Sequence, residues 1–271
     1  MSDKNEKDYV LATFDTVAKA YDEVEFFKTS ANNIIDMVDL KAGDKVLDVA
    51  CGTGNVILKL ASAFPKVDCT GVDIAQAMLD VAIDTAKSKS LHNTNFICQD
   101  IEQLNGGAKY NLITCSYALF FLPNPIDTLK TLVNLLDKDG MLIFTSFTEQ
   151  AFEPSSPILI EALQSFGIAL EDDDKQQWKE LRTEEDIRTL CEKSGFTPHH
   201  IETRAIRYPL SIQQWWNLKM STGYRGMIDE LKPNDFETVK ENYFREMEKH
   251  SNQSGEVGLI ADTLYTKILR N

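Results

Sequence analysis

The sequence lacks several features that mark common classes of protein. Its 271 residues contain no apolar run approaching the roughly 18 residues that a membrane-spanning helix needs. The amino-terminal stretch MSDKNEKDYV has no apolar segment of the signal-peptide kind. The five cysteines form no CxxC pair, and four fall in or beside predicted strands, where a thiol acts as a small apolar group. We therefore expect reduced cysteines, no metal site, no membrane span and a cytoplasmic location.

Positive charge is also scarce. The 28 Lys and Arg residues are outnumbered by 42 Asp and Glu residues, which gives a formal net charge of −14. A field of that sign repels phosphate backbones and anionic lipid surfaces, so nucleic acids and membranes are poor partners. The most acidic run, residues 171–174, is interpreted as a solvated loop and not as a metal site.

What the sequence does contain is an alternation of short β-branched runs and helical stretches. Strands are predicted at 46–50, 68–72, 94–98, 110–116 and 141–147, and helices at 55–64, 75–88 and 125–136. This pattern predicts an α/β fold: a doubly wound, mostly parallel, seven-stranded Rossmann-like sheet with helices on both faces and a helical cap.

The remaining segments are assigned around that core. Residues 1–40 are predicted as a helical lid segment, 41–150 as the ligand-binding α/β core, and 151–210 as linker helices with a sixth strand at about 199–208. The aromatic-rich residues 211–255 are predicted as a helical cap insertion. Residues 256–271 are predicted to return to the core as a closing strand over 257–269.

The stretch VLDVACGTG at residues 46–54 carries the first chemical signal. A strand that enters a glycine-rich turn and leaves as a helix presents bare backbone N–H groups at the carboxyl edge of the sheet. Gly52 and Gly54 permit positive φ and close approach of a ligand. Asp73 ends the second strand, about where this architecture presents a carboxylate to ribose hydroxyls. We therefore predict an adenosine-type ligand over the first two strand ends.

The turn chemistry favours one cofactor over another. A dinucleotide site uses GxGxxG, whereas Ile57 occupies the third glycine position and Asp48 adds a carboxylate within the strand. An extra carboxylate repels a pyrophosphate but suits the amino group and sulfonium of S-adenosylmethionine (SAM). The third strand ends in Asp100 and Ile101, which suit the amino group and ring of adenine.

Four motifs in order resemble the class I SAM-dependent methyltransferases, of the small-molecule branch that includes the quinone-biosynthesis C-methyltransferases. They are LDVACGTGN, GVDIAQAMLDVA, FICQDIEQL and the stretch from Tyr110 to Phe147, within a similarity spanning about residues 10–147. The upstream segment 14–22 also resembles that branch, in which a Tyr-Asp pair helps to cover the cofactor. One departure is Ala50, where many family members have glycine.

The resemblance implies roles for individual residues. It implies that Tyr21 covers the cofactor, that Asp73 holds the ribose and that Ser116 lies with Tyr117 beside the methyl group. The remaining cofactor residues that it implies are Asp48, Ala50, Gly52 and Gly54 at the methionine end, and Ile74, Met78, Asp100 and Ile101 around the adenine.

Candidates for catalysis and acceptor binding are less sharply indicated. A general base is needed if the acceptor is a hydroxyl or an acidic carbon, and Tyr117, Glu149 and His250 are the candidates. The aromatic cluster in 208–244 is either the core of a subdomain or the roof over an acceptor. Arg225 is the candidate for an anionic acceptor group. The predicted acceptor-binding residues are Tyr117, Phe121, Tyr208, Trp215, Trp216, Tyr224 and Arg225.

The resulting hypothesis is an enzyme that transfers a methyl group from SAM to a small molecule, with the accepting atom (O, N, S or C) left open. Two alternatives remain. One is a SAM- or NAD-binding enzyme of different chemistry on the same scaffold, and the other is a non-catalytic SAM-binding regulatory protein.

Overall fold

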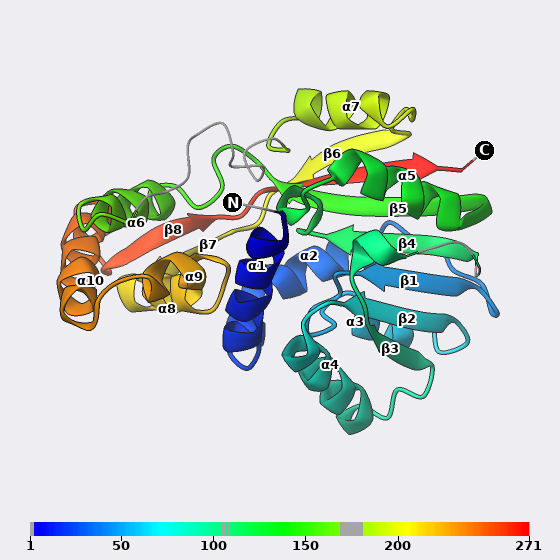
Figure 1. Ribbon diagram of the computed structural model, residues 1–271, viewed down its shortest axis with the longest axis horizontal. Coiled ribbons are helices and arrows are strands. Elements are labelled where there is room, and N and C mark those ends of the chain that lie inside the picture. Colours follow the sequence, from blue (N-terminus) through cyan, green and yellow to red (C-terminus); the bar gives the residue numbers. More distant parts are fainter. Residues whose placement is uncertain (1–2, 105–106, 108, 169–180, 271) are drawn as a thin grey trace.

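A seven-stranded sheet forms the centre of the protein, for which a computed structural model describes residues 3–104, 107, 109–168 and 181–270 (Figure 1). The strand order is β3-β2-β1-β4-β5-β9-β6. Strands β1 to β5 pair in parallel, and β9 runs antiparallel between β5 and β6. The predicted doubly wound, mostly parallel, seven-stranded sheet is confirmed. The strands are β1 Lys45–Val49, β2 Asp68–Asp73, β3 Thr94–Cys98, β4 Tyr110–Ser116, β5 Leu136–Phe147, β6 His200–Arg204 and β9 Thr263–Leu269.

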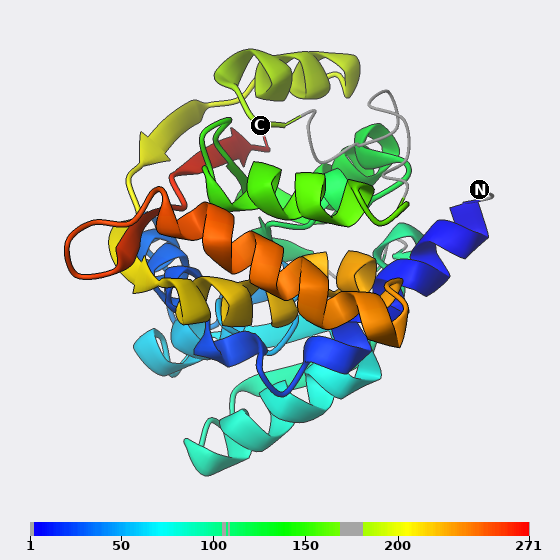
Figure 2. The same cartoon turned by 90° about the vertical axis from the view of Figure 1, so that its left-hand side faces the viewer.

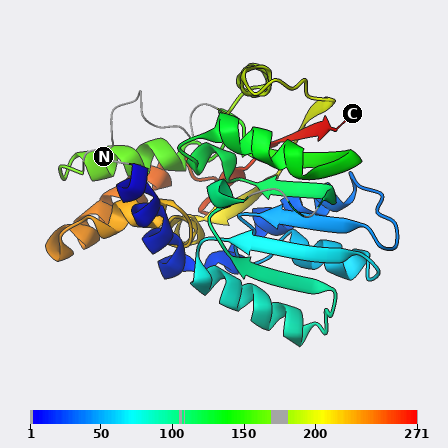
Figure 3. The same ribbon diagram turned by 45° about the vertical axis from the view of Figure 1, so that its right-hand side comes forward.

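Helices cover both faces because successive strand residues point to opposite sides of the sheet. Alternate residues such as Val46 and Leu112 join a cluster with α2 (Glu25–Ile35) and α3 (Ile57–Ala63). Their neighbours Leu47 and Ile113 join a cluster with α5 (Pro125–Leu135) and α7 (Glu184–Lys193). Helix α4 (Gln76–Ser88) packs along β2 and β3 at one edge (Figure 3). The strands are therefore apolar on both faces, as a covered parallel sheet requires.

The centre of the sheet holds the point at which the chain changes direction. Strand β1 lies between β2 and β4, so the connections after β1 and β4 leave toward opposite edges. In open α/β sheets such a point leaves a crevice outside the carboxyl ends of the strands. Helix α1 (Asp3–Val17) and three short 3-10 helices surround this crevice: η1 Tyr21–Glu23, η2 Ile101–Gln103 and η3 Leu119–Phe121.

A second layer lies beyond that end of the sheet. It contains α6 (Ser155–Gln164), α8 (Ile212–Met220), α9 (Tyr224–Asp229) and α10 (Pro233–Glu248), which we call the cap. Helix α10 packs on both α6 and α8, so the cap is one layer of crossing helices (Figure 2). Helix α1 contacts α9 on one side and α4 on the other, and therefore bridges the cap and the sheet (Figure 1). No described helix is long and apolar enough to cross a membrane. The acidic run at 171–174 lies outside the described residues.

Two strand predictions were wrong in the same way. The strand predicted at about 199–208 is two strands, β6 and β7 (Arg207–Ser211), and the one predicted at 257–269 is two strands, β8 (Glu256–Ile260) and β9. Strands β7 and β8 pair only with each other, in a separate two-stranded sheet that leads into the cap. The break occurs where the buried Asp262 carboxylate accepts hydrogen bonds from the Ile206 N–H (3.1 Å) and from Arg207 Nε (3.0 Å). Because Asp262 accepts these hydrogen bonds, the chain can leave the main sheet here without losing the hydrogen-bond partner of the buried Ile206 N–H.

The strand predicted at 141–147 begins earlier than expected. Strand β5 already begins at Leu136, and its pairing with β4 shifts register between Tyr110 and Leu112. A Cβ at Gly140 would lie 2.8 Å from the Tyr110 carbonyl oxygen, so a side chain would not fit at this irregularity. The segment is therefore a bulged extension of the strand, in which glycine permits the close approach of β4.

We expect Asp262→Ala to lower the free energy of unfolding by about 1–3 kcal/mol, because it strands the buried Ile206 N–H and removes the charged partner of Arg207. Asp262→Asn, which keeps an acceptor oxygen, should lose less. Urea unfolding of both variants measures this difference. A midpoint for Asp262→Ala equal to that of the wild type would show that the carboxylate does not hold the junction between the two sheets.

Candidate functional site

The turn after β1 has the backbone shape that its glycines predict. Ala50, Gly52 and Gly54 all have positive φ, at 51°, 54° and 86°. A Cβ at Gly52 would meet no atom within 4 Å and would project into open space. A Cβ at Gly54 would lie 2.9 Å from the Leu58 side chain, so this glycine is needed for packing. Ala50 adopts a left-handed conformation, which costs an L-residue about 1–2 kcal/mol.

Asp73 links the ends of the first two strands. Its Oδ2 accepts a hydrogen bond from the Gly52 N–H and its Oδ1 accepts one from the Ala75 N–H, both at 2.8 Å. Burial raises the pKa of Asp73, although these backbone hydrogen bonds oppose the rise. The carboxylate is therefore fixed in orientation before any ligand arrives, at the edge where the sequence predicts a ribose-binding group.

Asp48 lies beneath the turn. Its side chain is 1% exposed, and its Oδ1 accepts a hydrogen bond from the Thr114 hydroxyl at 2.6 Å. Burial raises the pKa of Asp48 to about 7, against the lowering effect of the hydrogen bonds from Thr114 and the Ile57 N–H. The nearby Asp73 charge adds to the rise. A positive charge above the turn would reverse this effect, because it favours the ionised carboxylate.

A cavity of about 120 Å³, which we call the edge cavity, opens beside the turn. Asp48 and Gly54 are absent from its lining, because one lies below the turn and the other packs against α3. Every other predicted cofactor residue lines it: Tyr21, Ala50, Gly52, Asp73, Ile74, Met78, Asp100, Ile101 and Ser116.

The far end of the edge cavity is closed by a contact that the sequence did not indicate. Asp100 caps η2 through its Oδ1, which accepts a hydrogen bond from the Glu102 N–H at 2.9 Å. Its Oδ2 pairs with Lys7 Nζ of α1 at 2.7 Å, and Lys7 also pairs with the Glu102 carboxylate. The sequence gives no sign of this contact, because α1 and η2 are far apart along the chain and meet only in the folded protein.

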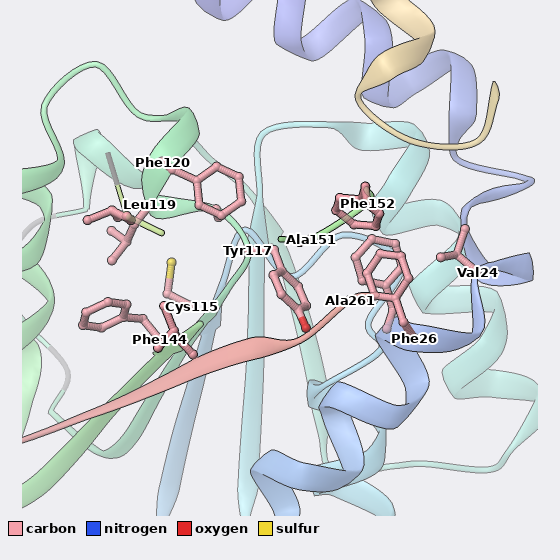
Figure 4. Close-up of a cluster of buried hydrophobic side chains, with 14 of the residues drawn as sticks. Val24, Phe26, Cys115, Tyr117, Leu119, Phe120, Phe144, Ala151, Phe152 and Ala261 are labelled. Carbon is pink, nitrogen blue, oxygen red and sulfur yellow. The ribbon is translucent and has the colours of Figure 1, made fainter. Parts of the chain in front are cut away.

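A larger cavity of about 460 Å³, the cap cavity, lies between the sheet edge and the cap. It shares four lining residues with the edge cavity: Phe14, Tyr21, Tyr117 and Phe121. Phe26, Phe152 and Tyr117 all line this cavity, and Figure 4 shows them side by side. The centroid of the Phe26 ring lies 5.5 Å from that of Phe152 and 6.1 Å from that of Tyr117. The four residues at which the two cavities adjoin are therefore all aromatic.

The three candidate bases are poorly placed for that role. Tyr117 lines both cavities, but its hydroxyl is hydrogen-bonded to Thr263 Oγ1 at 2.7 Å, and burial raises its pKa well above the usual value. Glu149 lines neither cavity, and its backbone carbonyl accepts a hydrogen bond from Arg182. His250 lies in a shallow surface depression beside β7 and β8.

Several predicted acceptor-binding residues also lie elsewhere. Trp215 and Trp216 are buried within the cap, and Trp215 Nε1 donates a hydrogen bond to the Val257 carbonyl at 3.1 Å. Tyr208 lines the same surface depression as His250. Arg225 pairs with Asp229 on its own helix at 2.7 Å. Of this set, Tyr117, Phe121 and Tyr224 line the cap cavity. The aromatic cluster is thus mainly the core of the cap, the alternative that was left open.

The charged residues of the cap cavity, together with Ser156, come from the segment at 151–210 interpreted as linker. Glu153, Ser156 and Glu161 belong to α6 and the turn before it, and Arg182 precedes α7. Arg182 Nη2 donates to the Thr148 carbonyl at 3.0 Å, which fixes the guanidinium at the end of β5. Their sequence signal was a Pro-Ser-Ser-Pro break, which indicates a boundary but does not show which side chains point inward.

The edge cavity suits a cationic adenosine-type ligand by its chemistry. It combines the half-buried Asp73 carboxylate with open space in front of Gly52 and an apolar slot that includes Ile74, Ile101 and Met78. The buried Asp48 lies outside the lining but close enough for its charge to interact with that of Asp73. A pyrophosphate would meet repulsion from the carboxylates. The sulfonium and the amino group of SAM would be attracted by the same carboxylates.

Comparison with known proteins gives consistent matches. Residues 40–201 match the protein family described as Methyltransferase domain. The chain is 31% identical over 150 residues to aklanonic acid methyltransferase DauC of a Streptomyces species, covering 54% of this chain and 68% of that protein. It is 26% identical over 207 residues to malonyl-[acyl-carrier protein] O-methyltransferase of Bacillus anthracis, covering 74% of this chain and 75% of that protein. The fold matches the plantazolicin methyltransferase BamL, solved with S-adenosylhomocysteine, at a TM-score of 0.54 and 18% identity, covering 99% and 98%.

We expect Asp48→Asn to change the pH dependence of stability. The folded-state pKa of Asp48 is raised from 3.8 to about 7, so the folded protein holds this proton more tightly than the unfolded chain. Stability of the wild type relative to the variant should therefore fall as the pH rises from about 4 to about 7, by up to roughly 4 kcal/mol. Urea unfolding at stepped pH measures this, with Asp68→Asn at the exposed start of β2 as control. A difference between wild type and Asp48→Asn that is constant with pH would contradict it.

Proposed function

Because the chain belongs to the methyltransferase domain family and is a SAM-dependent methyltransferase, we propose that it methylates a small, largely apolar acceptor held in the cap cavity. One observation carries this proposal. The cap cavity, about 460 Å³ in volume, shares the side chains of Phe14, Tyr21, Tyr117 and Phe121 with the edge cavity. An acceptor and a cofactor would meet between these rings, where the two cavities adjoin, and not across a ring, which would hold the reacting atoms too far apart.

The proposed cofactor contacts follow from the edge cavity. Asp73 would hold the ribose hydroxyls, because its half-buried carboxylate lines the edge cavity and is already oriented by two backbone N–H groups. Ile74, Met78 and Ile101 would enclose the adenine. Asp48 would contribute negative potential from below the turn without touching the ligand. When bound, SAM supplies a methyl group on a positively charged sulfur.

The protein's contribution to methyl transfer is mainly alignment and exclusion of water. In-line displacement from a sulfonium yields a neutral leaving group, so no nucleophile from the protein is required. Holding two reactants at about 3 to 3.5 Å can supply about 7–11 kcal/mol of the barrier reduction. The rings of Phe26, Phe147 and Phe152 line the cap cavity and keep it apolar. They would position a flat or acyl acceptor by contact and exclude water.

The polar rim of the cap cavity would orient the acceptor. Arg182 brings a positive charge to this side of the cavity, and Glu153 and Glu161 bring negative charges. An acceptor with a polar group at one end would be fixed by these residues, with its apolar body against the aromatic wall. The chain's net charge of −14 opposes docking of an acidic carrier protein. We therefore favour a free acceptor over a carrier-bound one, in the cytoplasm, where the free cysteines fit a reducing environment.

We expect Asp73→Ala to weaken the binding of S-adenosylhomocysteine by about 1–3 kcal/mol, through loss of charge-assisted hydrogen bonds to the ribose. Isothermal titration calorimetry measures the affinity directly. Asp15→Asn, which alters an exposed carboxylate of α1 near Ala77, is the matched control. Affinity unchanged by Asp73→Ala would show that the ribose binds elsewhere.

The acceptor proposal is tested by a radiolabelled methyl transfer screen. The panel should contain apolar phenols, carboxylic acids, acidic carbon compounds, amines and thiols, with acyl-carrier-protein substrates as a separate arm. We expect incorporation into free apolar acceptors. Incorporation only into carrier-bound acceptors would refute the free-acceptor proposal. Cofactor binding without incorporation into any compound would favour a non-catalytic SAM-binding protein.

A further inference from the structure

The cap contains a lysine with no exposure to solvent. Lys219 lies in α8 with 0% of its surface exposed, and its Nζ donates a hydrogen bond to Ser156 Oγ at 2.8 Å. Within the part of the chain that the structure describes, no carboxylate forms an ion pair with it. Burial lowers the pKa of Lys219 well below its usual value, and the Glu153 charge opposes this only in part. Burial therefore favours the neutral amine, the form that can accept a proton.

Ser156 connects this amine to the cap cavity. Ser156 is a lining residue of the cavity, whereas Lys219 is not and contacts Ser156 from behind. A third group joins them: the hydroxyl of Tyr224, another lining residue, is hydrogen-bonded to Ser156 Oγ at 2.6 Å. Helices α6, α8 and α9 thus each contribute one residue to a continuous hydrogen-bonded path from cavity to amine.

The surroundings suit an amine that becomes positively charged during a reaction. Lys219 Nζ lies 3.6 Å from the centroid of the Tyr224 ring, 5.3 Å from that of Phe152 and 5.7 Å from that of Trp215. The faces of aromatic rings attract cations, more strongly when water is excluded. Such a site would hold a transient ammonium ion that no adjacent carboxylate neutralises.

We propose that Ser156 and Lys219 form a proton relay that deprotonates the acceptor, so that the natural acceptor carries an acidic hydroxyl or an acidic carbon. This rests on the proposed function and deepens it. Ser156 is the group that touches the acceptor, and Lys219 acts through it. Tyr224 positions Ser156 and supplies the ring face for the ammonium ion. The three candidate bases of the sequence are not needed.

The step balances in protons and electrons. With Lys219 as a neutral amine, the Ser156 hydroxyl rotates to donate to Nζ across the same 2.8 Å contact. The acceptor O–H or C–H bond then breaks, and its proton moves to Ser156 Oγ while the former hydroxyl proton of Ser156 moves to Lys219 Nζ. The electron pair left on the acceptor forms the new bond to the methyl group, and the pair of the broken carbon–sulfur bond stays on sulfur. Lys219 ends as an ammonium ion, which returns its proton to water through Ser156 when the product leaves.

The charged and titratable groups around the relay determine how the rate of methyl transfer depends on pH. Glu153 precedes α6, Arg182 precedes α7, and Tyr243 of α10 is hydrogen-bonded to Ser155 at 2.7 Å. Burial raises the pKa values of Tyr224 and Tyr243, so both remain neutral donors near neutral pH. The relay accepts a proton only while Lys219 is an amine. Methyl transfer should therefore increase as the pH rises through the pKa of Lys219 and then level off.

The relay is tested with 4-nitrophenol, whose visible absorption distinguishes phenol from phenolate. The phenol is added to protein saturated with S-adenosylhomocysteine, at a pH below its solution pKa. We expect wild-type protein to bind it as phenolate, and Lys219→Met and Ser156→Ala to reduce the bound phenolate about tenfold or more. Lys240→Met, which removes a lysine 5.7 Å from the Phe244 ring outside the cavity, should behave as wild type.

The outcomes separate the relay from the proposed function. Calorimetry with S-adenosylhomocysteine on the same samples tests the cofactor site alone, and circular dichroism with thermal melting confirms that each variant is folded. If Lys219→Met does not fold, Ser156→Ala decides. Cofactor binding with the phenol unbound, bound in its neutral form, or bound equally as phenolate by the variants overturns the relay and leaves the cofactor site intact. No cofactor binding overturns the proposed function itself.

A second measurement uses an acceptor found in the methyl transfer screen. Loss of a general base typically lowers the rate about 10²- to 10⁴-fold. We expect Lys219→Met to lose a factor of this size in kcat and to abolish the rise of the rate with pH, while KM changes little. A variant that keeps the wild-type pH profile would show that Lys219 only holds α6 against α8.

Discussion

The site depends on the way Asp73 joins the first two parallel strands. Each carboxylate oxygen is held by a backbone N–H, one from the turn after β1 and one from the start of the segment after β2. The first of these N–H groups, that of Gly52, belongs to a turn that adopts positive φ at Ala50 and Gly52. The orientation of this acid is therefore set by the backbone, and the aromatic wall and the cap are assembled around an edge that is already fixed.

Asp48 adds a second negative charge to that edge at an energetic cost. A carboxylate that is 1% exposed and close to another acid is unfavourable in the free protein, and its raised pKa expresses that cost. A cationic ligand relieves it by favouring the ionised form. The edge is thus better suited to a positively charged adenosine compound than to a dinucleotide, which agrees with the methyltransferase family match over residues 40–201.

The sequence predicted the part of the site whose residues lie close together along the chain. The turn at 50–54 and Asp73 follow strands with a clear pattern, so their convergence could be inferred from parallel topology alone. Lys7, Ser156 and Lys219 could not be found in this way, because they meet only through the packing of α1, α6 and α8. Trp215 was open to either interpretation, since an aromatic residue on a helix looks the same in sequence whether it faces a ligand or a core. The split strands were missed because neither break, at residues 205–206 and 261–262, contains the glycine or proline that would have marked it.

The paired exit and return at Asp262 has a consequence for how such proteins diversify. The stretch between β6 and β9 leaves and re-enters the main sheet at one place, held by the contacts of Asp262 with Ile206 and Arg207. A contiguous insert that begins and ends at a single anchor can be exchanged as a unit without disturbing the parallel strands. Chimeras that carry another enzyme's insert from residue 207 to residue 260 would replace α8, α9 and α10, and with them the side of the cap cavity that includes Leu218, Tyr224 and Met227, on an unchanged cofactor half.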